Sequence, residues 1–205
     1  MEENKIFPEN WKEIVREKKV ILYNTGVSSL LHEKEKHIEK MKWVFQVFQE
    51  HPEVVLWWRP HPLEISTLQS MRPELEEQYM EVRRWYQEDK IGILDESADL
   101  NRAIAISDAY YGAWSSITHL YKIVGKPMLT SNSTIIKKEG GEKLEETLDG
   151  YELEGDSSFF QGESKKYTLP GYVRAVANDK ADIRMKKIDF CGEKIYETVA
   201  NSTRG

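Results

Sequence analysis

The chain of 205 residues has one cysteine, no long apolar run and no excess of positive charge. The single cysteine, Cys191, excludes a disulfide within the chain and is typical of a reducing compartment. No apolar run approaches the roughly 18 residues of a membrane span, and the acidic, polar N-terminus does not resemble a signal peptide. The formal net charge of −6 argues against a nucleic-acid-binding surface. These absences predict a cytoplasmic globular protein.

The common short motifs of enzyme sites are also missing. The chain has no G-x-G-x-x-G after its first predicted strand and no G-x-x-x-x-G-K-[ST], so the usual dinucleotide and P-loop sites are excluded. It has no Cys-x-x-Cys or His-Glu-x-x-His for zinc, and no G-x-S-x-G nucleophile elbow. No cluster of acidic residues indicates a metal site. We therefore expect no metal and no cofactor.

Short apolar runs alternate with helical patterns along the first 130 residues. The predicted strands cover residues 19–25, 54–59, 90–95, 108–112 and 127–130. The predicted helices cover residues 33–50, 63–89 with an interruption at Pro73, 99–107 and 115–124. This alternation predicts an α/β fold, in which a Rossmann-like parallel sheet has helices on both faces.

The pattern divides the chain into three parts. Residues 1–18 are a lead-in segment, and residues 19–135 form the Rossmann-like core. Residues 136–205 are less regular and contain helices expected to pack on the core. Those helices are predicted near 142–148, over 169–179 and from Cys191 onward.

Three of the five predicted strand ends carry polar residues. Ligands of parallel α/β sheets bind at the carboxyl ends of the strands, so these residues are candidate site residues. Free N–H groups and hydroxyls at a helix start suit a phosphate, arginine binds it bidentately, and histidine can donate to it. The candidates are Asn24, Thr25, Gly26, Arg59, His61, Trp114, Ser115, Ser116 and His119.

Each candidate also has an ordinary structural interpretation. Serine is a preferred helix cap, which by itself accounts for Ser115 and Ser116. His61 can hydrogen-bond the loop backbone, and Arg59 can pair with an acidic neighbour. His119 is expected at the surface and His37 in solvent, whereas Trp57 and Trp58 are expected in the core.

Two segments together resemble a known family. "VVLWWRPHP" and the later "ISDAYYGAWSSITHLYKIVGKPML" resemble the C-terminal, donor-binding half of CDP-glycerol glycerophosphotransferases, the bacterial teichoic-acid primases and polymerases with a GT-B fold. The matching positions include Asp108, the serine pair and the sequence Gly125, Lys126, Pro127. The chain departs from the family pattern at Ala113, Trp114 and Leu120, and in the loop "NTGVSSLL".

The resemblance implies a phospho-group transferase in which the donor CDP-glycerol delivers glycerol phosphate to a polyol-phosphate or glycan acceptor and CMP leaves. It implies catalytic roles for His61 and Arg59 and no catalytic metal. It implies donor phosphate or nucleotide binding by the remaining candidates, Ser115, Ser116, Asn24, Thr25, Gly26, Trp114 and His119.

The resemblance also implies an acceptor domain or partner subunit N-terminal to this half, and membrane contact at the inner face only through the rest of the enzyme. Two alternatives stay open. One is half of a GT-B glycosyltransferase that uses a sugar nucleotide. The other is a non-catalytic Rossmann-like module that binds a nucleotide or a protein.

Overall fold

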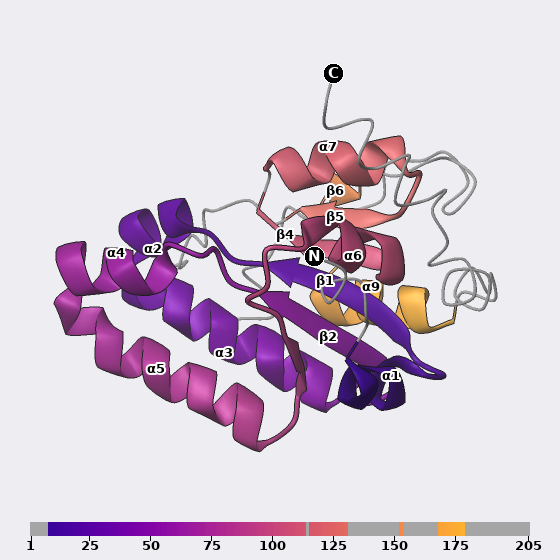
Figure 1. Cartoon of the computed structure of the whole chain (residues 1–205), viewed down its shortest axis with the longest axis horizontal. Coiled ribbons are helices and arrows are strands. Elements are labelled where there is room, and N and C mark those ends of the chain that lie inside the picture. The colour runs from indigo at the N-terminus through magenta and orange to yellow at the C-terminus, as the bar shows by residue number, and fades with distance from the viewer. Residues whose placement is uncertain (1–7, 114, 131–151, 154–167, 179–205) are drawn as a thin grey trace.

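The computed structural model describes residues 8–113, 115–130, 152–153 and 168–178. Its strands form one sheet in the order β3-β2-β1-β4-β5-β6 (Figure 1), where β1 to β5 are parallel and β6 is antiparallel. The strands are β1 (Lys19–Asn24), β2 (Val54–Arg59), β3 (Gly92–Leu94), β4 (Ala109–Gly112), β5 (Met128–Thr130) and β6 (Glu152–Leu153). The predicted Rossmann-like α/β fold is confirmed.

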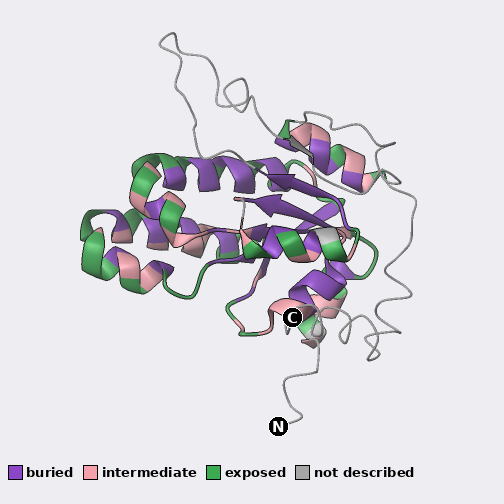
Figure 2. Cartoon of the chain, turned by 90° about the horizontal axis from the view of Figure 1, so that it is seen from above, coloured by how far each residue is buried: buried purple, intermediate pink, exposed green. Residues whose placement is uncertain are grey.

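The helices lie on both faces of this sheet, with buried residues toward the strands and exposed ones outward (Figure 2). They are α1 (Glu9–Val15), α2 (Val27–Glu33), α3 (Glu35–Gln49), α4 (Glu64–Met71), α5 (Pro73–Glu88), α6 (Leu100–Ile106), α7 (Ser116–Ile123) and α9 (Leu169–Ala177). Among the described residues, no helix combines the length and the apolar character needed to cross a membrane.

Two of the predicted helices are divided in the structure. Pro73 begins α5, where its missing N–H costs nothing, and the non-helical Arg72 before it separates α4 from α5 as predicted. The other break was not predicted. The helix expected over residues 33–50 begins instead at Glu35, after Lys34 with φ of 54°, and α2 precedes that residue.

Strand β2 connects the two halves of the core. All six of its residues are buried, and successive side chains point to opposite faces of the sheet. Trp57 packs with residues of α1, α6 and α7, whereas Trp58 packs with residues of α3, α5 and α9. Both tryptophans are fully buried, as predicted.

The segments outside the predicted core also contribute elements. In α1, the ring of Trp11 lies 5.3 Å from that of Trp57, edge to face, and the guanidinium of Arg102 lies 5.3 Å from the Trp11 ring centre. The helix predicted over 169–179 is α9, whereas β6 was not predicted. The helices predicted near 142–148 and from Cys191 fall outside the described residues.

Gly92 lies where β3 meets β2 and has no room for a side chain. A Cβ at this position would lie 2.0 Å from the carbonyl oxygen of Leu56 and 2.6 Å from the hydroxyl of Tyr86. That hydroxyl donates to the Leu56 carbonyl at 2.7 Å and to the Ile93 carbonyl at 3.1 Å. The β2–β3 pairing and the Tyr86 hydrogen bonds therefore both require glycine at this position.

We predict that Gly92→Ala lowers the free energy of unfolding by about 3 kcal/mol, because the methyl group forces the strands apart or displaces Tyr86. Urea unfolding measures this change. Gly26→Ala is the matched control, since no atom lies within 4 Å of its would-be Cβ, and it should cost less than about 1 kcal/mol. Equal costs for the two variants would contradict the prediction.

The expectation that His37 is solvated is wrong. Its side chain is 3% exposed on α3, and neither ring nitrogen has a hydrogen-bond partner within the described residues. Burial, together with the nearby Lys40, lowers the pKa of His37 to about 4. The carboxylate of Glu33, which also interacts with Lys40, is buried, and burial raises its pKa. The many charged residues around His37 indicate a solvent-exposed helix, but this position lies on the side of α3 that faces the core.

The lowered pKa of His37 makes stability pH-dependent. Between pH ~6.5 and ~4 the unfolded chain binds a proton at this histidine and the folded chain does not, so stability falls as the pH falls. Replacing His37 by Gln should remove a loss on the order of 2 kcal/mol between pH 7 and pH 4.5, measured by urea unfolding. The raised pKa of Glu33 increases stability as the pH falls, opposite to His37. The free energy of unfolding of His37→Gln is therefore compared with that of the wild type at each pH. An unchanged pH dependence in His37→Gln, or an equal change in the exposed His32→Gln, would refute the assignment.

Candidate functional site

The carboxyl ends of three strands lie in line at one edge of the sheet. Asn24 at the end of β1 is in register with Arg59 of β2 on one side and with Gly112 of β4 on the other. Neighbouring strands are about 4.8 Å apart, so the backbones of Arg59 and Gly112 are about 10 Å apart. From β1 the strand order runs through β2 to β3 on one side, and β4 and β5 lie on the other side. The switch point of the sheet is therefore between β1 and β4, at this edge.

Gly112 brings the ends of β1 and β4 close together. Its φ is 150°, and a Cβ would lie 2.8 Å from both the Asn24 carbonyl oxygen and the Tyr110 hydroxyl. The same hydroxyl donates to the carbonyl oxygen of Ala113 at 2.8 Å. Tyr110 therefore fixes the loop between β4 and α7, where the sequence predicts a phosphate site.

The predicted residues at the start of α7 include one helix cap. The Ser115 hydroxyl accepts from the Ile117 N–H at 3.3 Å, and its carbonyl accepts from the Thr118 N–H at 3.1 Å. These contacts are those of a cap, as the ordinary interpretation has it. Ser116 and His119 are exposed, and Trp114 lies outside the described residues. Phosphate binding by this group stays a prediction.

The three candidate residues at and after the end of β1 have different surroundings. The Asn24 side chain donates to the Thr25 carbonyl at 3.0 Å. The Thr25 side chain is 2% exposed, and its hydroxyl accepts from the indole N–H of Trp58 at 3.1 Å. Gly26 precedes α2 and borders open space. Thr25 therefore anchors the loop to the core, while Gly26 lies where the loop is exposed.

Arg59 pairs with a buried carboxylate that the sequence analysis did not single out. Its guanidinium donates to Asp95 Oδ2 at 2.7 Å and to the Ser97 carbonyl at 2.5 Å. Asp95 is 1% exposed and also accepts from the Trp57 indole at 3.1 Å and from the Ser97 N–H at 2.9 Å. Arg102 adds a second positive charge, 3.9 Å from Asp95 Oδ1. These contacts match the ordinary ion-pair interpretation of Arg59, whose catalytic role stays a prediction.

His61 is exposed and is held by its own loop. Its Nδ1 accepts from the Leu63 N–H at 3.2 Å, and its backbone N–H donates to Glu64 Oε1 at 3.2 Å. A neutral imidazole that accepts at Nδ1 carries its proton on Nε2. The exposed Nε2–H can therefore donate to a phosphate oxygen.

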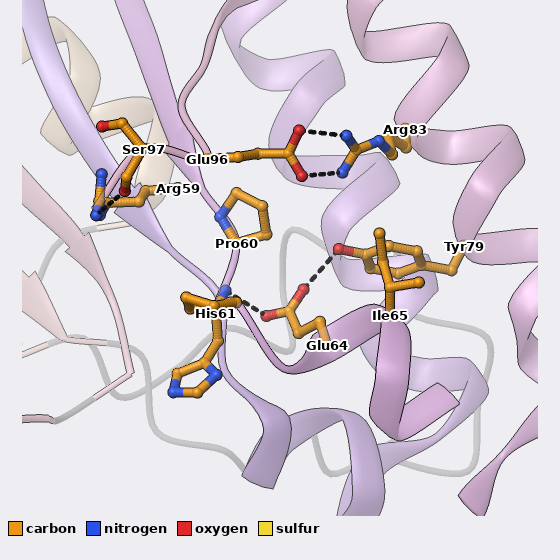
Figure 3. Close-up of a pocket in the computed structure, with 10 residues that line it drawn as sticks. Arg59, Pro60, His61, Glu64, Ile65, Tyr79, Arg83, Glu96 and Ser97 are labelled. Atoms are coloured by element: carbon orange, nitrogen blue, oxygen red, sulfur yellow. Dashed lines mark hydrogen bonds and ion pairs between the residues drawn. The ribbon is translucent and has the colours of Figure 1, made fainter. Parts of the chain in front are cut away.

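A small pocket lies beside this loop (Figure 3). Its volume is about 40 Å³, room for little more than one water molecule, whereas pockets for whole ligands measure about 300–1,000 Å³. Arg83 and Glu96 close one side with two hydrogen bonds of 2.8 and 2.5 Å, and the His61 imidazole points away from this pair. The lining residues are Arg59, Pro60, His61, Pro62, Glu64, Ile65, Tyr79, Arg83, Glu96 and Ser97.

Two residues of the family resemblance have structural contacts away from this edge. Asp108 precedes β4 at its amino end, where its carboxylate accepts from the Val20 N–H at 2.8 Å. The Lys126 ammonium donates to the carbonyls of Ile104, of Ala105 at 2.9 Å and of Ser107 at 2.7 Å. A lysine on these carbonyls stabilises the carboxyl end of α6. These parts of the motif thus support the fold.

Sequence reasoning missed Asp95 and Glu64. Asp95 is the last residue of the third predicted strand and could have been found as the polar residue at that strand end, as for the other three. Glu64 carries no such signal, because it lies at the start of a charged helical segment and only the contacts with His61 and Tyr79 show that its carboxylate is buried.

Comparisons of the chain with protein-family models, with curated proteins and with solved structures each return no match. The class of the protein is therefore defined by its own fold and site. It is a Rossmann-like α/β protein with a polar strand-end edge at the switch point of its sheet.

Replacing Asp95 by Asn should lower the free energy of unfolding by about 3 kcal/mol, because it leaves the buried Arg59 without its counter-charge. Chemical unfolding monitored by circular dichroism measures this. Asp99→Asn is the matched control: Asp99 caps α6 by accepting from the Arg102 N–H at 3.0 Å, and asparagine caps equally well. A cost for Asp95→Asn as small as that of the control would show that the pair contributes little.

Proposed function

We propose that this chain is the donor-binding half of a CDP-glycerol glycerophosphotransferase-like enzyme of teichoic-acid-type polymer synthesis. The observation that carries the proposal is the register of β2, β1 and β4. It lines up the His61 loop, Gly26 and the start of α7 along one edge of the sheet. Ligands of this fold bind at such an edge, and the sequence resemblance points to the same residues.

In the proposed reaction an acceptor hydroxyl oxygen bonds to the β-phosphorus of CDP-glycerol. The bond from that phosphorus to the bridging oxygen breaks, and CMP leaves with the electron pair. The Nε2–H of His61 would stabilise the negative charge that develops on the phosphate oxygens. The resemblance places the base that takes the acceptor's proton on the acceptor half.

The other predicted residues have supporting roles in this proposal. Ser116 and the first N–H groups of α7 would hold phosphate oxygens, because a helix start favours anions. Arg59 donates to Asp95 and Ser97, which favours a structural role, holding the loop that carries His61, over direct contact with the donor.

Calorimetric titration with CDP-glycerol, CMP and UDP-sugars tests the proposal. CDP-glycerol should bind, CMP more weakly, and UDP-sugars weakest. His61→Ala should weaken CDP-glycerol binding about ten- to a hundred-fold, the loss of one charge-assisted hydrogen bond. His51→Ala is the matched control: His51 lies before the opposite end of β2 and pairs with Glu53 at 3.0 Å, so its affinity should be unchanged.

The alternatives predict other outcomes. Preference for a UDP-sugar would assign the chain to a glycosyltransferase half. No response to any of these nucleotides would contradict both enzymes and leave the non-catalytic module.

A further inference from the structure

Glu64, the first residue of α4, has a buried carboxylate that joins three other segments of the fold. Its side chain is 1% exposed, beside the candidate site (Figure 3). Oε1 accepts from the backbone N–H of His61 at 3.2 Å, and Oε2 accepts from the Tyr79 hydroxyl of α5 at 2.6 Å. The Thr25 hydroxyl, which follows β1, is a further donor. One side chain therefore connects the loops after β1 and β2 with α5.

Glu64 and His61 hold each other in a reciprocal arrangement. The Glu64 backbone N–H donates to the His61 carbonyl at 2.9 Å, while its carboxylate accepts from the His61 N–H. The imidazole in turn accepts from the Leu63 N–H at 3.2 Å. The backbone bond closes a turn over residues 61–64, and the carboxylate of the last residue of that turn returns to the N–H of the first. The two residues fix the backbone and the ring of His61 together.

Loss of this carboxylate would leave donors without an acceptor. The Trp58 indole donates to the Thr25 hydroxyl, so the Thr25 proton is directed at Glu64. The His61 N–H likewise has Glu64 Oε1 as its acceptor. Burial raises the pKa of Glu64, and the hydrogen bonds from Tyr79, Thr25 and His61 oppose that rise. The loop conformation thus depends on an acceptor at this position.

We propose that Glu64 is the positioning residue of His61. By holding the His61 N–H it keeps the turn in which Leu63 reaches Nδ1, and so it keeps the imidazole in the Nε2–H tautomer with that proton directed outward. The ligand class is an anion with phosphate oxygens, and this part rests on the proposed function. The tautomer and the turn do not depend on it.

Nitrogen NMR of the histidine side chains tests the positioning directly, without a ligand. In the wild type at neutral pH, the neutral His61 ring should be predominantly Nε2–H, and Glu64→Leu should convert it to a mixture of tautomers. Tyr79→Phe is the matched control, because it removes only the α5 donor from the same carboxylate and should leave the tautomer unchanged. A wild-type tautomer in Glu64→Leu, or an equal change in both variants, would overturn the proposal.

Glu64→Gln keeps the test valid if the leucine variant does not fold. Its single carbonyl oxygen must serve the donors of His61, Tyr79 and Thr25, so the Nε2–H population should fall, but by less than in Glu64→Leu. Adding Tyr79→Phe removes a competing donor, so the Nε2–H population of His61 should rise back toward the wild-type value. Failure of this restoration counts against the proposal.

Binding of CDP-glycerol gives the second readout. Glu64→Leu should weaken binding by the same factor as His61→Ala, about ten- to a hundred-fold, and the double variant should be no weaker than either single variant. Additive losses would show that Glu64 does not act through His61. If the wild type binds no nucleotide, the proposed function fails, while the NMR comparison still decides the role of Glu64.

Discussion

The carboxyl edge of the sheet depends on the buried ion pair between Asp95 and Arg59. Asp95 follows β3, Arg59 ends β2, and the same carboxylate accepts from Trp57 and lies near Arg102 of α6. A buried charge without a partner is strongly destabilising, so the packing of these elements is weakened when the pair is broken. The position of the loop that carries His61 follows from this constraint, because that loop begins directly after Arg59.

A second buried carboxylate, Glu64, acts on the same loop from the opposite side. Arg59 is held by Asp95, and the His61 backbone is held by Glu64. Each cationic or hydrogen-bonding residue of the "RPHP" segment therefore has its own acidic partner inside the protein. A phosphate at this edge would meet oriented N–H donors more than uncompensated positive charge, which is consistent with the acidic composition of the chain.

The sequence predicts the elements of this fold well where burial is uniform and poorly where a single backbone angle decides. Strand β2 was predicted to the residue because all six of its side chains are buried. The break at Lys34 has no glycine, proline or asparagine to signal it. For the site, strand ends located the candidate residues, but the partner of Arg59 lies 36 residues away along the chain. Only the packed structure shows that the guanidinium faces Asp95.

The adjacent tryptophans of β2 give the protein two built-in optical probes. The indole of Trp57 contacts Asp95 directly, and that of Trp58 reaches Glu64 through the Thr25 hydroxyl. Because consecutive side chains in a strand point to opposite faces, each ring samples a different half of the core. With the other four of the six tryptophans replaced by phenylalanine, the intrinsic fluorescence of this dipeptide would report a rearrangement of either carboxylate without an attached label.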